Sequence, residues 1–200
     1  MNHRQTKAGR PRNPALDRAI LSTAARQLGE LGYARMSLES VAAAAGTTTP
    51  SLRRRYRNKA ELAAAVIGSL RVEEPPAGAP TPRAHALAIL ENFHSNLRAI
   101  PALAILGSLL AEEERHPELL HLFKTRLVEP RRALLRQALA AGDLPESADL
   151  DALTSMLIGS FYGRYVTIAG IPDDWPDRVL STIWPPGTRG SQATRERSRR

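Results

Sequence analysis

Residues 38–59 read LESVAAAAGTTTPSLRRRYRNK, and this stretch decides the fold. The residues that begin and end helices predict two short helices joined by a tight turn, because Ser37 caps the first helix, Gly46 ends it and Pro50 begins the second. A helix-turn-helix needs a small residue at the crossing, a turn residue that tolerates positive φ, and apolar anchors in both helices. The candidate packing residues are Val41, Ala42, Ala45, Gly46 and Leu52. An ordinary helical hairpin is the alternative.

The charge around this stretch favours the helix-turn-helix. Residues 1–60 hold twelve Lys and Arg against three Asp and Glu, whereas residues 61–184 have a net charge of −5. Like charges in adjacent turns destabilise a solvated helix face, so the basic run 53–59 requires another explanation. A basic N-terminal third on an acidic body is typical of a modular polyanion binder.

Amino-acid composition limits the possible fold classes and the kinds of chemical site. The chain has 200 residues, 4% aromatics and no cysteine, which excludes disulfides, thiolate metal sites and cysteine nucleophiles. No run alternates like a strand, so an all-α fold is expected, in the cytoplasm, with no secretion signal and no membrane span. The histidines form no metal-ligand pattern, and no catalytic or cofactor-binding motif occurs. We therefore predict no enzyme activity, no cofactor and no metal.

The positions of proline and glycine divide the chain into five parts with about nine helices. We expect a flexible basic arm (1–13), a DNA-binding domain (14–72), a Pro-rich linker (73–82), a C-terminal helical domain (83–184) and a disordered basic tail (185–200). Pro130 should kink or split the helix expected over 117–141. Simple solubility is the alternative role for the arm.

Residues 14 to about 70 resemble the TetR-type family of bacterial transcriptional regulators. The resemblance rests on the Gly32-Tyr33 exit of the first helix, on Ala45-Gly46 and on the register of residues 47–62. It implies a three-helix DNA-binding domain with a helix-turn-helix, followed by a larger C-terminal helical bundle. It also implies a homodimer on a palindromic operator, and a repressor that a small-molecule effector releases.

The recognition helix would be residues 50–56, with its N-terminal side chains at base edges in the major groove. The expected base contacts are Thr47, Thr49, Pro50, Ser51 and Arg54. The expected phosphate contacts are Thr48, Arg53, Arg55, Tyr56 and Lys59, two of which depart from the family, since it usually has Tyr and His at the positions of Arg53 and Arg55. Pro50 departs too, and it stiffens the reading end of the helix.

The resemblance places the dimer contact on the last two helices. Glycines four residues apart allow close approach and an aromatic side chain can anchor it, which gives Gly159, Tyr162 and Gly163. Packing inside the subunit against 102–141 is the alternative. A ligand pocket would be lined by Phe93, Asn96, Leu106, Phe123 and Tyr162, although each of these also fits plain core or surface.

Two other functions fit parts of the sequence. The basic arm and tail would suit a nonspecific architectural DNA-binding protein, whose affinity ignores base sequence and disappears in salt. A helical enzyme with an unrecognised motif is the second alternative.

Overall fold

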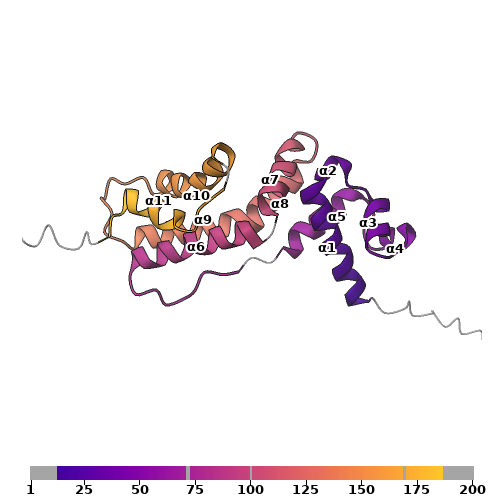
Figure 1. Ribbon diagram of the computed structural model, residues 1–200, viewed down its shortest axis with the longest axis horizontal. Helices are drawn as coiled ribbons and strands as arrows, with labels where there is room; N and C mark the ends of the chain where they lie inside the picture. The colour runs from indigo at the N-terminus through magenta and orange to yellow at the C-terminus, as the bar shows by residue number, and fades with distance from the viewer. Residues whose placement is uncertain (1–12, 71–72, 100, 169, 187–200) are drawn as a thin grey trace, which may run out of the picture. The chain divides into compact units, whose positions relative to one another are not determined.

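The computed structural model describes residues 13–70, 73–99, 101–168 and 170–186 (Figure 1). Throughout these ranges the chain forms α-helices and one π-helical turn, without a strand, as the sequence predicted. The expected arm and tail lie outside the described residues except at Asn13, Pro185 and Pro186. None of the helices described combines the length and apolar character that a bilayer span requires.

The described residues divide into two compact units that interleave along the sequence. The first unit joins residues 13–70 to 101–123, and the second joins 73–99 to 124–168 and 170–186. The sequence had placed 101–123 in the C-terminal domain. They pack instead with the first unit, where the backbone N–H of Tyr33 donates to Ser108 Oγ at 2.6 Å.

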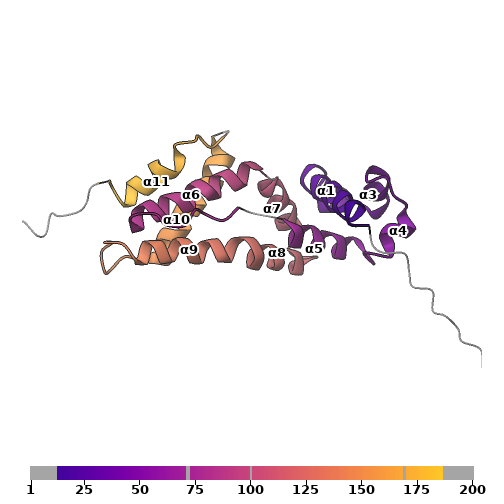
Figure 2. The ribbon, with the colours of Figure 1, turned by 90° about the horizontal axis from the view of Figure 1, so that it is seen from below.

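The first unit is built from seven helices. They are α1 (Pro14–Glu30), α2 (Gly32–Arg35), α3 (Leu38–Ala44), α4 (Thr49–Arg53), α5 (Lys59–Ser69), α7 (Ala102–Ala111) and α8 (Pro117–Phe123). Both Figure 1 and Figure 2 place α4 at the edge of this unit away from α7 and α8. The core side chains, among them Ile20, Leu28, Leu62 and Val66, are fully buried. Leu31, the residue that follows α1, is 39% exposed.

Side-chain caps fix where these helices begin. Asn13 Oδ1 accepts the backbone N–H of Ala15 at 3.0 Å, and Asn58 Oδ1 accepts that of Glu61 at 2.8 Å. Ser37 forms a reciprocal capping box with Ser40. Each cap satisfies N–H groups that lack a partner within the helix, so the short helices of this unit start at defined residues.

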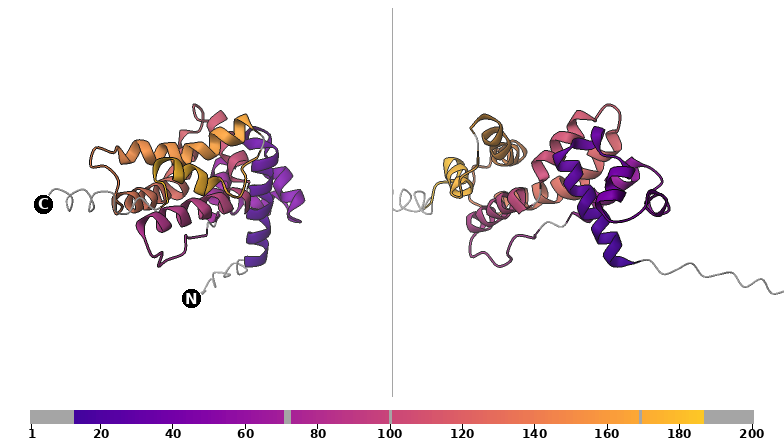
Figure 3. Two further views of the ribbon diagram at one scale, coloured as in Figure 1. Left: turned by 60° about the vertical axis from the view of Figure 1, so that its left-hand side comes forward. Right: turned by 45° about the vertical axis from the view of Figure 1, so that its right-hand side comes forward.

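The second unit consists of α6 (Pro82–Ala99), the π turn η1 (Lys124–Val128), α9 (Glu129–Ala140), α10 (Leu150–Thr167) and α11 (Trp175–Ile183). Helices α6 and α9 pack side by side (Figure 2), and α11 lies beside α10 (Figure 3). Pro130, expected to kink or split the helix, lies in the first turn of α9, and the π turn η1 precedes it, so the chain stays helical from α8 into α9 with a change of hydrogen-bonding pattern. Residues 73–81 form no helix, as their prolines predicted.

Two contacts lock the ends of this bundle. Arg83 at the start of α6 donates to the Trp184 carbonyl oxygen at 2.8 Å and to Ser181 Oγ at 2.8 Å, which ties α6 to the end of α11. The Trp184 ring covers Gly142 so closely that a Cβ there would lie 1.9 Å from Cη2. Glycine is therefore required where the chain leaves α9.

Candidate nucleic-acid interface

Helices α3 and α4 pack against each other as a helix-turn-helix. Val41, Ala42 and Leu52 are at most 1% exposed and form the joint, while Ala45 is half-buried. Gly46 is exposed with φ of +67°, the left-handed conformation that the tight turn demands. The Thr47 N–H then returns to the Ala42 carbonyl oxygen at 2.9 Å, so the turn is closed by the backbone itself.

The residues predicted to read bases gather at α4. Thr47, Thr49 and Ser51 are half-buried, and Pro50 and Arg54 are exposed. The Thr48 side chain accepts the Ser51 N–H at 3.3 Å and is the N-cap of α4, so its hydroxyl already has a structural role. Leu52 is fully buried as the anchor, while Pro50, Arg53 and Arg54 are exposed.

Carboxylates pair with three of the four arginines around α4. Arg53 contacts Glu39 at 3.0 Å, and Arg57 contacts Glu61 at 3.2 Å, both in exposed pairs. Exposed pairs contribute little to stability and exchange readily with other charges. Arg54 is exposed and, within the ranges described, forms no ion pair. Its guanidinium is thus the one in this run that no neighbouring carboxylate holds.

The pKa of each carboxylate in these exposed pairs lies below its ordinary value. A hydrogen bond from its own backbone N–H, followed by contact with Arg53, lowers the pKa of Glu39 below 4.5. The backbone N–H of Arg57, which donates to Glu61 at 2.7 Å, lowers the pKa of Glu61 in the same direction. Both groups therefore stay ionised on a predominantly basic surface.

Arg55 has an intramolecular role that the sequence did not reveal. Its Nε donates to Asp17 Oδ1 at 2.7 Å, with side-chain exposures of 17% and 31%. Its terminal nitrogen also donates to the Ser51 carbonyl oxygen and hydroxyl, at 3.1 and 3.0 Å. Arg55 thus fastens the end of α4 to the first turn of α1, and its predicted phosphate contact stays a prediction.

Lys59 is also engaged inside the unit rather than free at its surface. Its Nζ donates to the carbonyl oxygens of Tyr33 and Ala34, at 2.8 and 3.2 Å, and lies 4.3 Å from the centre of the Tyr33 ring. These carbonyls belong to α2, so the ammonium joins the start of α5 to that helix. Tyr56, the remaining predicted phosphate contact, is half-buried next to this region in sequence.

Tyr33 is the residue around which these contacts assemble. It is 3% exposed, and the His116 ring meets it edge-on with centroids 4.8 Å apart. Burial, followed by the charges of Glu118 and Glu112, raises the pKa of its hydroxyl. The glycine-aromatic exit marked this position in the sequence, but its contacts with α5, with α7 and with His116 just before α8 join residues too distant in the chain for any motif to predict.

The five predicted pocket residues fall into different units. Leu106 and Phe123 belong to the first unit, whereas Phe93, Asn96 and Tyr162 belong to the second. Phe93 meets the Tyr162 ring edge-on with centroids 6.1 Å apart. In the parts of the chain that the structure describes, no three His, Asp or Glu side chains are grouped to hold a metal ion.

Asn96, one of the predicted pocket residues, has hydrogen-bond partners inside the second unit. Its side chain accepts the Glu73 N–H at 3.0 Å and donates to the Glu73 carbonyl oxygen at 3.1 Å. A further bond runs to the Asn92 carbonyl oxygen at 2.9 Å. The amide of this buried residue thus satisfies the backbone at the start of the linker, and it has a structural partner for each of its polar atoms.

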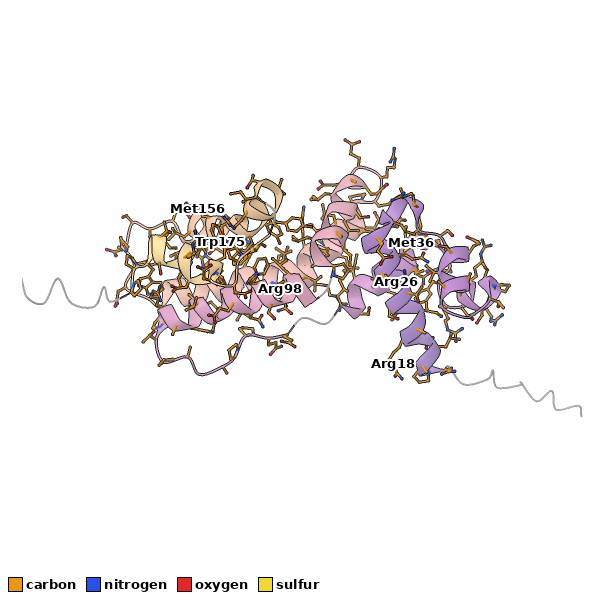
Figure 4. All side chains as sticks on the ribbon, in the orientation of Figure 1. Arg18, Arg26, Met36, Arg98, Met156 and Trp175 are labelled. Atoms are coloured by element: carbon orange, nitrogen blue, oxygen red, sulfur yellow. The ribbon has the colours of Figure 1, made fainter. Side chains whose placement is uncertain are left out.

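The predicted dimer residues differ in position. Gly159 and Gly163 on α10 are exposed, and a Cβ on either would meet no heavy atom within 4 Å. Tyr162 is half-buried, its ring meets Phe93 inside the unit, and burial raises its pKa. Exposed Met156 (Figure 4) and Val166, at 62% and 80%, extend the glycine face along α10, and sequence reasoning missed both.

The fold and the arrangement around α4 define a helix-turn-helix DNA-binding protein. Sequence profiles agree: residues 20–66 match "Bacterial regulatory proteins, tetR family", and residues 76–183 match "Tetracyclin repressor-like, C-terminal domain". The chain belongs to the TetR family of bacterial regulatory proteins, and as a member it is a DNA-binding transcriptional regulator.

Relatives and solved structures are consistent with this assignment. An uncharacterized HTH-type transcriptional regulator of Mycobacterium tuberculosis, Rv1556, is 30% identical over 80% of this chain and 82% of its own. YdeS of Bacillus subtilis, named in the same way, is 24% identical over 95% and 96%. HlyIIR, a hemolysin II transcriptional regulator, has a TM-score of 0.63 at 17% identity over 85% and 97%. The flavonoid-responsive regulator FrrA has a TM-score of 0.57 at 20% identity over 84% and 92%.

Proposed function

We propose that this regulator recognises a palindromic operator as a homodimer and represses transcription until a small-molecule effector releases it. The observation that carries the DNA part is the exposure around α4: Pro50 and Arg54 are exposed while Leu52 anchors the helix, and Arg54 forms no ion pair within the described ranges. A guanidinium can bind a guanine edge through two hydrogen bonds, whereas single hydroxyls discriminate weakly. The proposed base contacts are those predicted from the sequence, with Arg54 the strongest.

Fewer phosphate contacts are proposed than were predicted from the sequence, because two of the predicted residues have partners inside the unit. Arg53 keeps this role because its pair with Glu39 is exposed, and Thr48 and Tyr56 retain it by position. Arg55 and Lys59 support α4 and α5 from inside the unit and bind DNA only secondarily. This division predicts that sequence discrimination and fold stability depend on different basic residues.

The proposal of a homodimer rests on one face of α10. Met156, Gly159, Gly163 and Val166 are spaced three or four residues apart, so they share a face, and all four are exposed. Contiguous exposed apolar surface is typical of an interface, and the glycines allow a second helix to approach closely. Two recognition helices separated by about 34–36 Å would then read successive major grooves.

Met156→Asp tests the dimer directly. We expect sedimentation to show a monomer with reduced operator affinity, because a charge within an apolar interface must be desolvated. Ser147→Asp, on an exposed loop of the same unit, is the matched control and should remain dimeric. A Met156→Asp protein that stays dimeric would place the interface elsewhere.

Selection of bound sequences from random duplexes tests specificity. A palindromic consensus is expected, and scrambling one half-site should cost several times the roughly 1–3 kcal/mol of a single mismatched pair at fixed salt. An architectural DNA-binding protein would instead give no consensus. We further propose that the protein acts in the cytoplasm, where bacterial DNA lies, and without catalysis.

A further inference from the structure

A pocket of about 430 Å³ lies in the second unit between α6 and the start of α11. Its lining from α6 is spaced three, four and seven residues apart and therefore occupies one face of that helix. The lining residues are Glu91, His94, Ser95, Arg98, Asp173 and Pro176. Figure 4 labels Arg98, near the end of α6. None of them was among the predicted pocket residues.

His94 gives this pocket an unmet polar requirement. The residue is 5% exposed and its ring packs against Phe161 with centroids 5.9 Å apart, yet its Nε2 has no hydrogen-bond partner among the described residues. Leaving a buried nitrogen unsatisfied costs free energy, and buried polar groups in folded proteins nearly always find a partner. His94 lines the pocket but its Nε2 is covered, so the ring has to turn for a polar group bound there to supply that partner.

The charges around the pocket select the kind of polar group. Arg98 and Asp173 form an ion pair, so each neutralises the other. Glu91 is exposed and has no ion-pair partner within the described ranges. The remaining charge is therefore one carboxylate, which attracts a cation and repels an anion.

We propose that this pocket binds a small molecule carrying a protonated amine. The ammonium donates to the Glu91 carboxylate and to His94 Nε2, with the imidazole proton on Nδ1, and the Ser95 hydroxyl offers a further acceptor. Pro176 contacts the carbon skeleton. This inference rests on the proposed function, since it names the chemical class of the effector.

The test is a titration of the full-length protein followed at the imidazole ¹⁵N resonances. The probes are 1,4-diaminobutane, 1,4-butanediol and succinate, which share a four-carbon chain and differ in charge. The diamine should shift the His94 Nε2 resonance, and the diol and the diacid should not. Glu91→Gln should weaken diamine binding at least about fivefold, the effect of one close charge pair in water. His94→Phe should abolish binding while the protein stays folded.

Glu146→Gln is the matched control, because Glu146 is an exposed carboxylate in the loop between α9 and α10 and lines no part of this pocket. It should bind the diamine like the parent protein. Equal binding of all three probes, preference for succinate, or diamine binding that survives both Glu91→Gln and His94→Phe would overturn the proposal, as would no shift at any probe concentration.

Operator affinity is measured in a separate experiment, so failure of the amine-pocket proposal can be distinguished from failure of the proposed function. The diamine should release operator from the parent and from Glu146→Gln at the same concentration, and from Glu91→Gln only at a concentration at least about fivefold higher, which controls for general screening of DNA charge. Diamine binding at His94 without operator release would overturn the effector role. A protein that binds the diamine but no operator would refute the proposed function and leave the pocket chemistry standing.

Discussion

Replacing Lys59 with methionine separates support of the fold from contact with DNA. The change keeps the aliphatic stem and removes the ammonium that donates to the Tyr33 and Ala34 carbonyl oxygens at 2.8 and 3.2 Å. A hydrogen bond to a charged group contributes about 1.5–3 kcal/mol, and a cation–π contact about 0.5–1 kcal/mol at an exposed site. Because Lys59 is half-exposed, solvent screens these terms, and we expect a loss of about 2 kcal/mol.

Urea unfolding measures that loss, and the dependence of operator affinity on salt measures the phosphate contact. A lysine released from one phosphate lowers the slope of log K against log salt by about 0.9. We expect Lys59→Met to lose stability and to keep most of the slope. Arg54→Met is the converse control, since it should change operator binding and leave unfolding unaltered. A Lys59→Met protein of parental stability whose slope falls by about one unit would refute the internal role of Lys59.

Arg54→Gln should reduce discrimination at one base-pair position by about 1–3 kcal/mol, measured by competition among operators substituted at each position; uniform weakening would mean that Arg54 binds phosphate. Gly142→Ala should cost about 1–3 kcal/mol in thermal unfolding, because the added Cβ would lie 1.9 Å from the Trp184 ring. Gly107→Ala, which meets no atom within 4 Å inside α7, should instead gain about 0.5–1 kcal/mol. Since the folded pKa of Glu61 lies below 4.5, its stabilising contribution is complete above that pH and lost as pH falls through the folded value. Glu61→Gln should therefore flatten the acid limb of a stability–pH curve, and an unchanged limb would contradict the assigned cause.

Local rules predicted the parts of the fold that depend on neighbouring residues. The cap at Ser37, the left-handed turn at Gly46 and the change of helix type near Pro130 each follow from local chemistry within a few positions. The helix-turn-helix could be found for the same reason, because its spacing and its buried Leu52 lie in one short stretch.

Contacts between distant residues escaped prediction. The bond from Arg55 to Asp17 spans 38 positions, and that from Tyr33 to Ser108 spans 75. A basic run looks like a phosphate-binding surface in sequence, whichever of its members find carboxylates or carbonyls after folding. Only the glycines of the exposed α10 face were predicted, because glycines at this spacing indicate close helix approach. Met156 cannot be told from a core residue in sequence until its exposure is known.

The interleaving of the two units limits how this protein can be taken apart or recombined. A fragment cut at the proline-rich segment 73–82 would keep α1 to α5 but lose Ile105 and Leu109, which are buried in the same unit. The remaining helices would expose an apolar surface to water, which favours aggregation over an independent module. A chimaera that exchanges the DNA-reading end between relatives therefore has to carry two separate pieces of chain, and the second piece begins at Pro101.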